Sequence, residues 1–318
     1  MPADIKARPS GNDDARAKKM QELFSRIEAG VSGVFTSDNY RSYLRTMAKF
    51  HRYSARNCLL IHLQRPEATM VAGFDAWKKK FHRHVLAGEK GITIIGYALK
   101  SSTLRKPLRD EKGDPVIGDD GKPAIEYVKH SYPVYFPVYV YDVSQTEGEP
   151  LPQLVHDLEG DVASYQDFLA SCRKLSPYPI EFENIASPNV RGYCSFEEQR
   201  IVVRSGLSQV QTAKTVLHEI THAILHNEGD AKTRAEKELE AESAAFVICS
   251  HYGIDTSEYT FPYLASWCRQ ERDKLERCLD AIQKHAFSVI EQLDASMLEL
   301  EKAKADRSSL QQRLELAQ

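Results

Sequence analysis

The sequence lacks several features that define broad classes of protein. No apolar run reaches the roughly 18 residues that a membrane-spanning helix needs, and the N-terminal stretch lacks a signal peptide's apolar core. Its six cysteines include no Cys-x-x-Cys pair, which argues against a disulfide framework and a cysteine-ligated zinc site. We therefore expect a cytoplasmic protein with reduced thiols.

The most informative segment is His218-Glu219-Ile220-Thr221-His222. Two histidines four residues apart lie on one face of a helix, so both imidazoles can bind one metal ion. The carboxylate of Glu219 can take a proton from a water molecule that the metal has acidified. Residues 209–226 contain no Gly or Pro and space their apolar side chains as a helix does, with Ser208 as the expected N-cap. The segment therefore predicts a metal centre with Glu219 as general base.

A second helix-like segment supplies the third ligand. It carries Glu236, Glu238, Glu240 and Glu242 and passes into the apolar run 244–248. Glu238 and Glu242 are one turn apart and share a face, whereas the other two lie on different faces. We assign Glu238 as the ligand and Glu242 as the acceptor for the free N–H of a ligating histidine. The reverse assignment stays open, as does a solvated face for the whole acidic run.

His226 lies four residues beyond His222 and is not expected to bind the metal. A continuous helix carries it a further turn away, and no glycine stands between the two histidines to interrupt the helix. We interpret it as a histidine at a helix C-terminus, where it complements the dipole. Two histidines and a carboxylate favour one Zn²⁺ ion.

These residues resemble a known family. The stretch Lys214-Thr215-Val216-Leu217-His218-Glu219-Ile220-Thr221-His222-Ala223, then Glu238-Leu239-Glu240-Ala241-Glu242 and Gly253-Ile254-Asp255-Thr256, is similar to the zincin-type metallopeptidase domain of ArdC/LtrC-like antirestriction and conjugation proteins. A glutamate three residues before an alanine also recurs in ImmA/IrrE-type zincins, which supports Glu238. In zincins a strand placed like residues 200–203 typically lines the cleft and pairs with an extended peptide.

The resemblance extends upstream and covers residues 20–267. There it implies a single-stranded-DNA-binding domain, and with it a protein of a mobile element that acts in antirestriction or DNA transfer. The segments that carry it are Tyr53-Ser54-Ala55-Arg56-Asn57, residues 64–69, Gly73-Phe74-Asp75-Ala76-Trp77, residues 85–92 and Tyr141-Asp142-Val143-Ser144-Gln145-Thr146.

The charge distribution supports nucleic-acid contact independently of the family. Residues 41–110 contain 15 Lys or Arg against 4 Asp or Glu, a net charge of +11 in a chain whose total is −3. Interleaved aromatic residues suit single strands, whose bases stack on rings while cations follow the backbone. The alternative is that Trp77 and Phe81 form the core stripe of a helix and that the neighbouring lysines face solvent. The expected DNA-binding residues are Arg52, Arg56, Asn57, Trp77, Lys78, Lys79, Lys80, Arg83, His84 and Lys90.

The predicted fold class is α+β, with an N-terminal α/β single-stranded-DNA-binding domain, a zincin-like metallopeptidase domain and a long C-terminal helix. The expected boundaries are a flexible tail over 1–18, the first domain over 19–147, a linker over 148–160, the second domain over 161–270 and the helix over 271–318. We expect helices near 17–29, 37–49, 54–64 and 72–82, and strands near 92–99 and 131–143.

The C-terminal segment spaces apolar residues in steps of three and four from Leu275 to Leu314. Such a heptad seam forms either a dimeric coiled coil or a long helix folded back on its own chain. We favour a homo-oligomer here, and the family resemblance does not explain this segment.

Two classes of function remain open. In the first, the chain is a zinc endopeptidase, in which Tyr252, Tyr259 or Tyr263 stabilises the oxyanion and the substrate is unknown; a repressor or restriction-related protein is one such substrate. In the second, it is mainly a single-stranded-DNA-binding protein that protects incoming DNA, and its zinc site is structural. The sequence permits both at once.

Overall fold

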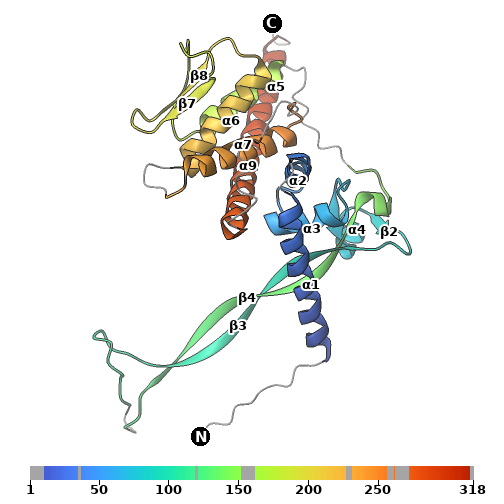
Figure 1. The fold of residues 1–318 in the computed structure, drawn as a ribbon, viewed down its shortest axis with the longest axis vertical. Coiled ribbons are helices and arrows are strands. Elements are labelled where there is room, and N and C mark those ends of the chain that lie inside the picture. The colour runs from blue at the N-terminus through green and yellow to red at the C-terminus, as the bar shows by residue number, and fades with distance from the viewer. Residues whose placement is uncertain are drawn as a thin grey trace.

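The computed structural model describes residues 11–34, 37–118, 121–151, 162–226, 231–255, 261 and 272–315. Helices and several small sheets give it the α+β fold that the sequence predicts. Figure 1 shows a mainly helical body from which a long two-stranded ribbon projects. Within these ranges, none of the helices combines the length and the apolar character that crossing a bilayer requires.

The N-terminal part begins with three helices, α1 (Gly11–Val34), α2 (Ser37–Lys49) and α3 (Ala55–Gln64). The apolar side chains of α2 recur at steps of three and four, so one face of the helix is buried against α3 and α7. Ser54 caps α3 by accepting a hydrogen bond from the backbone of Asn57.

Strands β3 (Ile92–Pro107) and β4 (Ile125–Asp142) form the projecting ribbon. They pair antiparallel from Ile92 opposite Val140 to Pro107 opposite Ile125, and the short strand β1 (Val71–Gly73) joins only the base of β4. Both strands are longer than predicted. Their inner ends bury side chains in the core, whereas their outer parts are exposed on both faces.

A small lobe follows β1. It contains α4 (Phe74–Lys80) and the paired strands β2 (Arg83–Val85) and β5 (Thr146–Gly148), with the 3-10 turn η1 (Val143–Gln145) before β5. The ring of Trp77 is fully buried, and its indole N–H donates to the carbonyl of Tyr141 over 2.9 Å. The helix therefore uses Trp77 as a core residue.

The C-terminal part contains α5 (Val162–Leu175), α6 (Gln209–Leu225), α7 (Arg234–His251) and a three-stranded sheet. The sheet has the order β6 (Ile180–Glu183), β8 (Arg200–Arg204), β7 (Gly192–Ser195). The strand that was expected to line the cleft, β8, is thus wrong for that role, because it lies between two partners and its backbone is already paired. The edge strand β7 lines the cleft instead.

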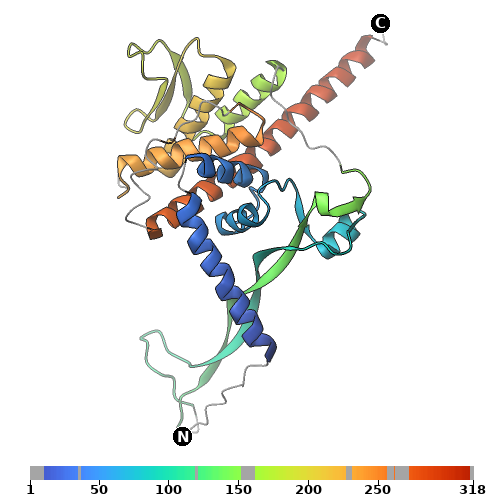
Figure 2. The same cartoon turned by 45° about the vertical axis from the view of Figure 1, so that its right-hand side comes forward.

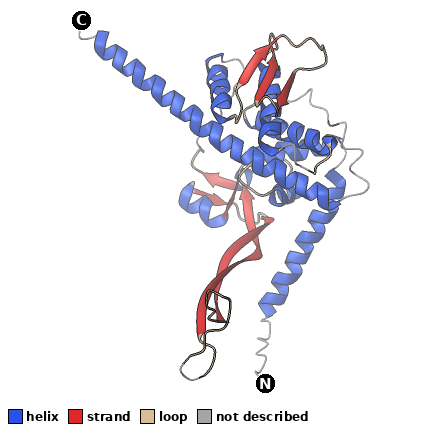
Figure 3. Ribbon diagram, turned by 90° about the vertical axis from the view of Figure 1, so that its left-hand side faces the viewer, coloured by secondary structure: helices blue, strands red, loops and turns tan. Residues whose placement is uncertain are grey.

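The long helix α9 (Arg272–Glu315) packs against α7 and α5, and at fewer points against α3. Figures 2 and 3 show its C-terminal half leaving the body. The seam side chains of its first half are buried within the chain, so that half of the seam follows the folded-back alternative. These buried seam residues are Leu275, Leu279, Ile282, Ala286, Val289 and Leu293.

Candidate metal centre

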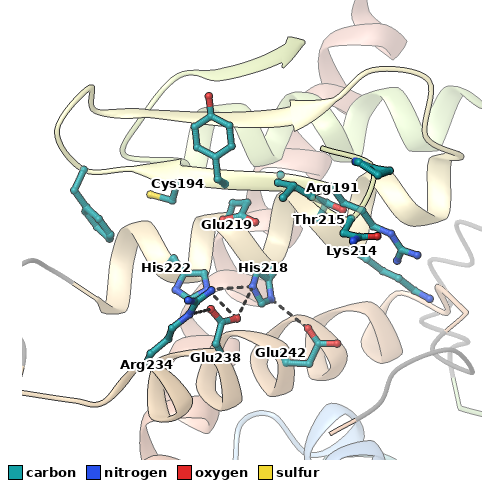
Figure 4. A pocket seen from close by; sticks show the side chains of 16 residues that line it. Arg191, Cys194, Lys214, Thr215, His218, Glu219, His222, Arg234, Glu238 and Glu242 are labelled. Carbon is teal, nitrogen blue, oxygen red and sulfur yellow. Dashed lines mark hydrogen bonds and ion pairs between the residues drawn. The ribbon is translucent and has the colours of Figure 1, made fainter. Parts of the chain in front are cut away.

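Helix α6 presents the two histidines of the motif to the solvent-facing side of the domain. Ser208 caps the helix through a hydrogen bond from the backbone of Gln211, as predicted. The Nε2 atoms of His218 and His222 lie 3.1 Å apart, so both rings point at one place (Figure 4).

Helix α7 lies beneath α6 and begins with a capping box between Thr233 and Glu236. One turn later, a carboxylate oxygen of Glu238 lies 3.5 Å from Nε2 of His218 and 3.8 Å from Nε2 of His222. A carboxylate oxygen of Glu242 lies 3.2 Å from Nδ1 of His218, on the far side of that ring (Figure 4). The two glutamates thus occupy the places that the predicted assignment requires of them.

The spacing of the three ligand atoms fits a tetrahedral ion. Bonds of about 2.0–2.2 Å to two imidazoles and a carboxylate put the ligand atoms about 3.3–3.6 Å apart, and the observed separations are 3.1, 3.5 and 3.8 Å. Among the residues that the structure describes, His218, His222 and Glu238 form the one group of three metal-binding side chains that converges in this way.

The electrostatics of the site favour a positive charge between the ligands. Burial on its own lowers the pKa of His218, but Glu238, Glu242 and Glu219 outweigh it and raise the pKa to about 10. Hydrogen bonds from His218 and His222 hold the pKa of Glu238 well below its usual range. The third ligand is therefore ionised at neutral pH, which is the state that binds a cation.

Glu219 points from α6 toward β7 and is only 7% exposed. Burial raises its pKa, although His218 and His222 oppose that shift, and the backbone N–H of Cys194 donates to its carboxylate. A carboxylate whose pKa is raised toward neutrality is better suited to accept and return a proton.

A cleft of about 860 Å³ lies over the ligand atoms, between α6, α7 and residues 188–196. Residues 188–196, which include β7, were missed in the sequence; their signal is Gly192, which stands where the strand passes closest to α6. Three basic side chains, those of Arg191, Lys214 and Arg234, also line the cleft (Figure 4).

His226 does not continue the helical stripe. Helix α6 ends at Leu225, and the backbone of His226 is extended, with φ −119° and ψ 131°. Its ring is buried, and burial lowers its pKa. The expectation of an exposed histidine that complements the helix dipole is therefore wrong.

The predicted oxyanion tyrosine is absent from the described part of the cleft. Tyr252 is buried, and its hydroxyl donates to a carboxylate oxygen of Asp294 on α9 over 2.8 Å. Its side chain is committed to that contact. Tyr259 and Tyr263 lie outside the described residues.

Several residues expected to contact DNA have structural partners instead. Arg52 and Arg56 form ion pairs with Glu291 and Glu276 of α9, at 2.9 and 3.0 Å. Arg83 hydrogen-bonds Thr146, and His84 lies 2.7 Å from a carboxylate oxygen of Glu147. Asn57 makes two hydrogen bonds to the backbone of Ile95, both 2.9 Å long. Trp77 is buried, so the prediction that it stacks on a base is wrong.

The remaining basic residues lie on two surfaces. Lys78, Lys79 and Lys80 are exposed along α4, where Lys79 lies 3.7 Å from Asp75. Lys90 lines a groove of about 490 Å³ between α1, the end of α3 and the base of the β3–β4 ribbon. The structure therefore separates the predicted basic cluster into a small patch on α4 and one residue of a different surface.

Comparison with known proteins identifies both parts of the chain. Residues 13–140 match the N-terminal domain of anti-restriction factor ArdC, and residues 177–263 match the IrrE N-terminal-like domain. An uncharacterized Bacillus anthracis protein, pXO2-81, is 24% identical over 90% of this chain, and the chain spans about half (53%) of that relative's length.

Two solved structures of antirestriction protein ArdC from plasmid R388 are also similar. The metal-free form is 19% identical, with a TM-score of 0.46, and covers 78% of this chain and 86% of its own. The Mn(II)-bound form is 18% identical, with a TM-score of 0.45 and coverage of 77% and 85%.

The second part of the chain thus belongs to the class of metallopeptidase-like domains with a His-Glu-x-x-His helix. The chain as a whole joins an ArdC-type N-terminal domain to an IrrE-like domain, which confirms the resemblance to ArdC-like antirestriction proteins.

Proposed function

We propose that the chain is an ArdC-like protein of a mobile element, which binds single-stranded DNA and hydrolyses peptide bonds at a zinc centre in antirestriction or DNA transfer. His218, His222 and Glu238 hold one Zn²⁺, and Glu219 is the general base. The proposal rests on one observation: three ligand atoms converge beneath a cleft that also contains a buried carboxylate.

Bound zinc supplies a Lewis acid that polarises the scissile carbonyl and lowers the pKa of water. Glu219 then accepts the proton of the attacking water and returns it to the leaving amide nitrogen. The backbone N–H of Cys194 fixes the carboxylate in the direction of the cleft. His218 and His222 bind through Nε2, because those are the atoms that face Glu238.

The edge strand β7 gives the cleft a means of holding an extended substrate. Its inner edge pairs with β8, and its residues Gly192, Tyr193 and Cys194 line the cleft. A peptide that adds to an exposed strand edge gains main-chain hydrogen bonds regardless of its sequence. An extended peptide held there runs past Glu219 and the metal ligands.

The test of the peptidase is Glu219→Gln, assayed on a randomised peptide library by mass spectrometry together with metal analysis. We expect zinc-dependent cleavage by the wild type, and in the variant an unchanged zinc content with cleavage at least about 100-fold slower. Glu197→Gln makes the same chemical change at an exposed position and is the matched control. Cleavage that survives Glu219→Gln overturns the assignment of the base. Zinc binding without cleavage by the wild type overturns the peptidase and favours a structural metal.

For single-stranded DNA, the groove at the base of the ribbon is the best candidate surface. Its lining includes Lys19, Arg26, Arg65, Lys90 and Tyr139 and contains no Asp or Glu. The Lys19 ammonium lies 4.7 Å from the centre of the Tyr139 ring. Cations beside an aromatic ring suit a strand whose phosphates and bases are both accessible.

Aromatic rings continue from this groove along one face of the ribbon. In the strand register, Tyr97 lies opposite Tyr135, and both share a face with Tyr139. Their side chains are 68%, 57% and 47% exposed. Farther out on the same face, the Arg105 guanidinium lies 5.9 Å from the centre of the Tyr127 ring. Such a row offers several bases a stacking surface with cations beside it.

Binding of a labelled oligonucleotide that weakens steeply with salt is the expected result, because each phosphate contact releases counterions. Duplex DNA and a neutral polymer serve as competitors. Equal affinity for the neutral polymer, or no affinity for the single strand, overturns this part of the proposal.

A further inference from the structure

His226 is a buried histidine outside the ligand group, and both of its ring nitrogens have partners. Its Nδ1 lies 2.9 Å from Nδ1 of His222, and its Nε2 lies 3.0 Å from a carboxylate oxygen of Glu240. The same oxygen of Glu240 accepts a hydrogen bond of 2.7 Å from the ammonium of Lys232. A continuous chain of polar contacts therefore leads from the candidate ligand His222 to Lys232.

One arrangement of protons satisfies this chain when His222 binds a metal through Nε2. Its proton is then on Nδ1 and is donated to Nδ1 of His226, which must be the acceptor. The proton of His226 is consequently on Nε2 and is donated to Glu240. Each imidazole thus has a defined tautomer, and the carboxylate at the end of the chain receives two donors.

Burial makes this chain selective. His226 and Glu240 are each 2% exposed, so water does not readily replace either partner. A buried carboxylate is costly without compensation, and here the compensation comes from Lys232 and from His226. Glu240 follows Glu238 by two residues, so one helix places a metal ligand on one face and the end of this chain on another.

We propose that His226 and Glu240, with Lys232 as their counter-charge, are positioning residues that fix the tautomer and ring orientation of His222 for metal binding. The inference rests on the proposed zinc centre. It complements the contact of Glu242 with Nδ1 of His218 at 3.2 Å. Each ligand imidazole then has its own carboxylate, reached directly from His218 and through a second imidazole from His222.

The experiment measures zinc affinity of the full chain by competition with a chromogenic chelator. Loss of a hydrogen-bond partner of a ligating histidine weakens metal binding about 10–100-fold, and we expect this for His226→Phe and Glu240→Gln. Glu240→Gln keeps the shape of the side chain and serves if His226→Phe fails to fold. His226→Gln retains an acceptor and a donor and is expected to bind zinc with intermediate affinity.

The matched control is His285→Gln. His285 is also buried and also contacts α6, with Nε2 3.0 Å from the hydroxyl of Thr221, but it touches neither ligand ring. Its zinc affinity is expected to stay within about two-fold of the wild type. Equal losses in His285→Gln and the His226 and Glu240 variants would mean that general destabilisation explains the effect, and would overturn the inference.

A second readout does not depend on bound metal. Long-range ¹H–¹⁵N spectra of the metal-free protein report the ring tautomers, and we expect His222 to carry its proton on Nδ1 in the wild type and to lose that preference in Glu240→Gln and His226→Phe. An unchanged tautomer and unchanged affinity overturn the positioning role. A wild type that binds no zinc overturns the metal centre itself, and this outcome is distinct from a failure of the variants.

Discussion

A Cβ atom on Gly192 of β7 would lie 2.6 Å from Cγ2 of Thr215 on α6. It would also lie 2.9 Å from the carbonyl oxygen of Val202 and 3.4 Å from Cγ of Glu219. The edge strand therefore approaches the catalytic helix as closely as two backbones with one side chain between them allow. This approach brings the backbone N–H of Cys194 to the carboxylate of Glu219.

Gly192→Ala is expected to move β7 away from α6, because neither Thr215 nor the Val202 backbone has room to retreat. Overpacking of this kind costs about 1–3 kcal/mol. Cleavage should fall at least about 10-fold, since a small misplacement of the substrate strand is sufficient, while zinc affinity stays unchanged. Gly73→Ala, where a new Cβ meets nothing within 4 Å, is the control. Unchanged cleavage in Gly192→Ala would contradict the role of β7.

The two candidate glutamate ligands differ in the expected effect of the same substitution. Glu238→Gln should abolish stoichiometric zinc binding, because its oxygen is the third corner of the ligand triangle. Glu242→Gln should weaken binding only about 10–100-fold, because it removes a partner of His218 and no ligand. Metal analysis after gel filtration separates these outcomes. The opposite pattern would establish the reverse assignment.

The groove and the α4 patch predict different DNA-binding variants. Arg65→Glu with Lys90→Glu should weaken single-strand binding at least about 10-fold and flatten its salt dependence by about 0.7 per lost phosphate contact. Lys78→Glu with Lys80→Glu makes the same change in charge on α4 and should have a much smaller effect. Fluorescence anisotropy over a salt series measures both. Equal losses would show that general charge, not the groove, governs binding.

Stability should fall in mild acid because of a buried histidine on α9. Burial, with a smaller contribution from His226, lowers the pKa of His285 to about 4. An unfolded histidine titrates near pH 6.5, so between these values the unfolded chain binds more protons and the free energy of unfolding falls with pH. The loss amounts to about 3 kcal/mol by pH 4.

His285→Gln should remove much of this dependence, as measured by urea unfolding across that pH range. His130→Gln, at an exposed position of the ribbon, should leave it unchanged. An identical pH slope in the wild type and His285→Gln would assign the acid sensitivity to other groups.

Elements with a buried stripe were predictable from the sequence. Helix α2 spans the predicted residues 37–49, and α6 begins after the predicted cap. The ribbon was not predictable in length, because its outer residues pair only with each other and bury neither face. Without a buried face, the alternation that marks a strand disappears from the sequence.

The ligand triangle was predictable because its residues lie on two helices at fixed spacing. The partner of His222 was not, because it depends on where α6 ends and on how α7 lies beneath it. The basic residues failed for a related reason. Arg52 pairs with Glu291, 239 residues later in the chain, and local composition carries no information about such a partner.

Helix α9 touches the helices of both conserved regions. Arg56 pairs with Glu276, Gln283 donates to the backbone of His51, and His285 contacts Thr221 beside the candidate ligands. The two regions consequently share one cooperative unit of folding, and their stabilities are thermodynamically linked. A metal that binds only the folded state stabilises the whole unit by RT ln(1 + [L]/Kd). Zinc at α6 should therefore slow amide exchange as far away as α3, a helix with no metal ligand.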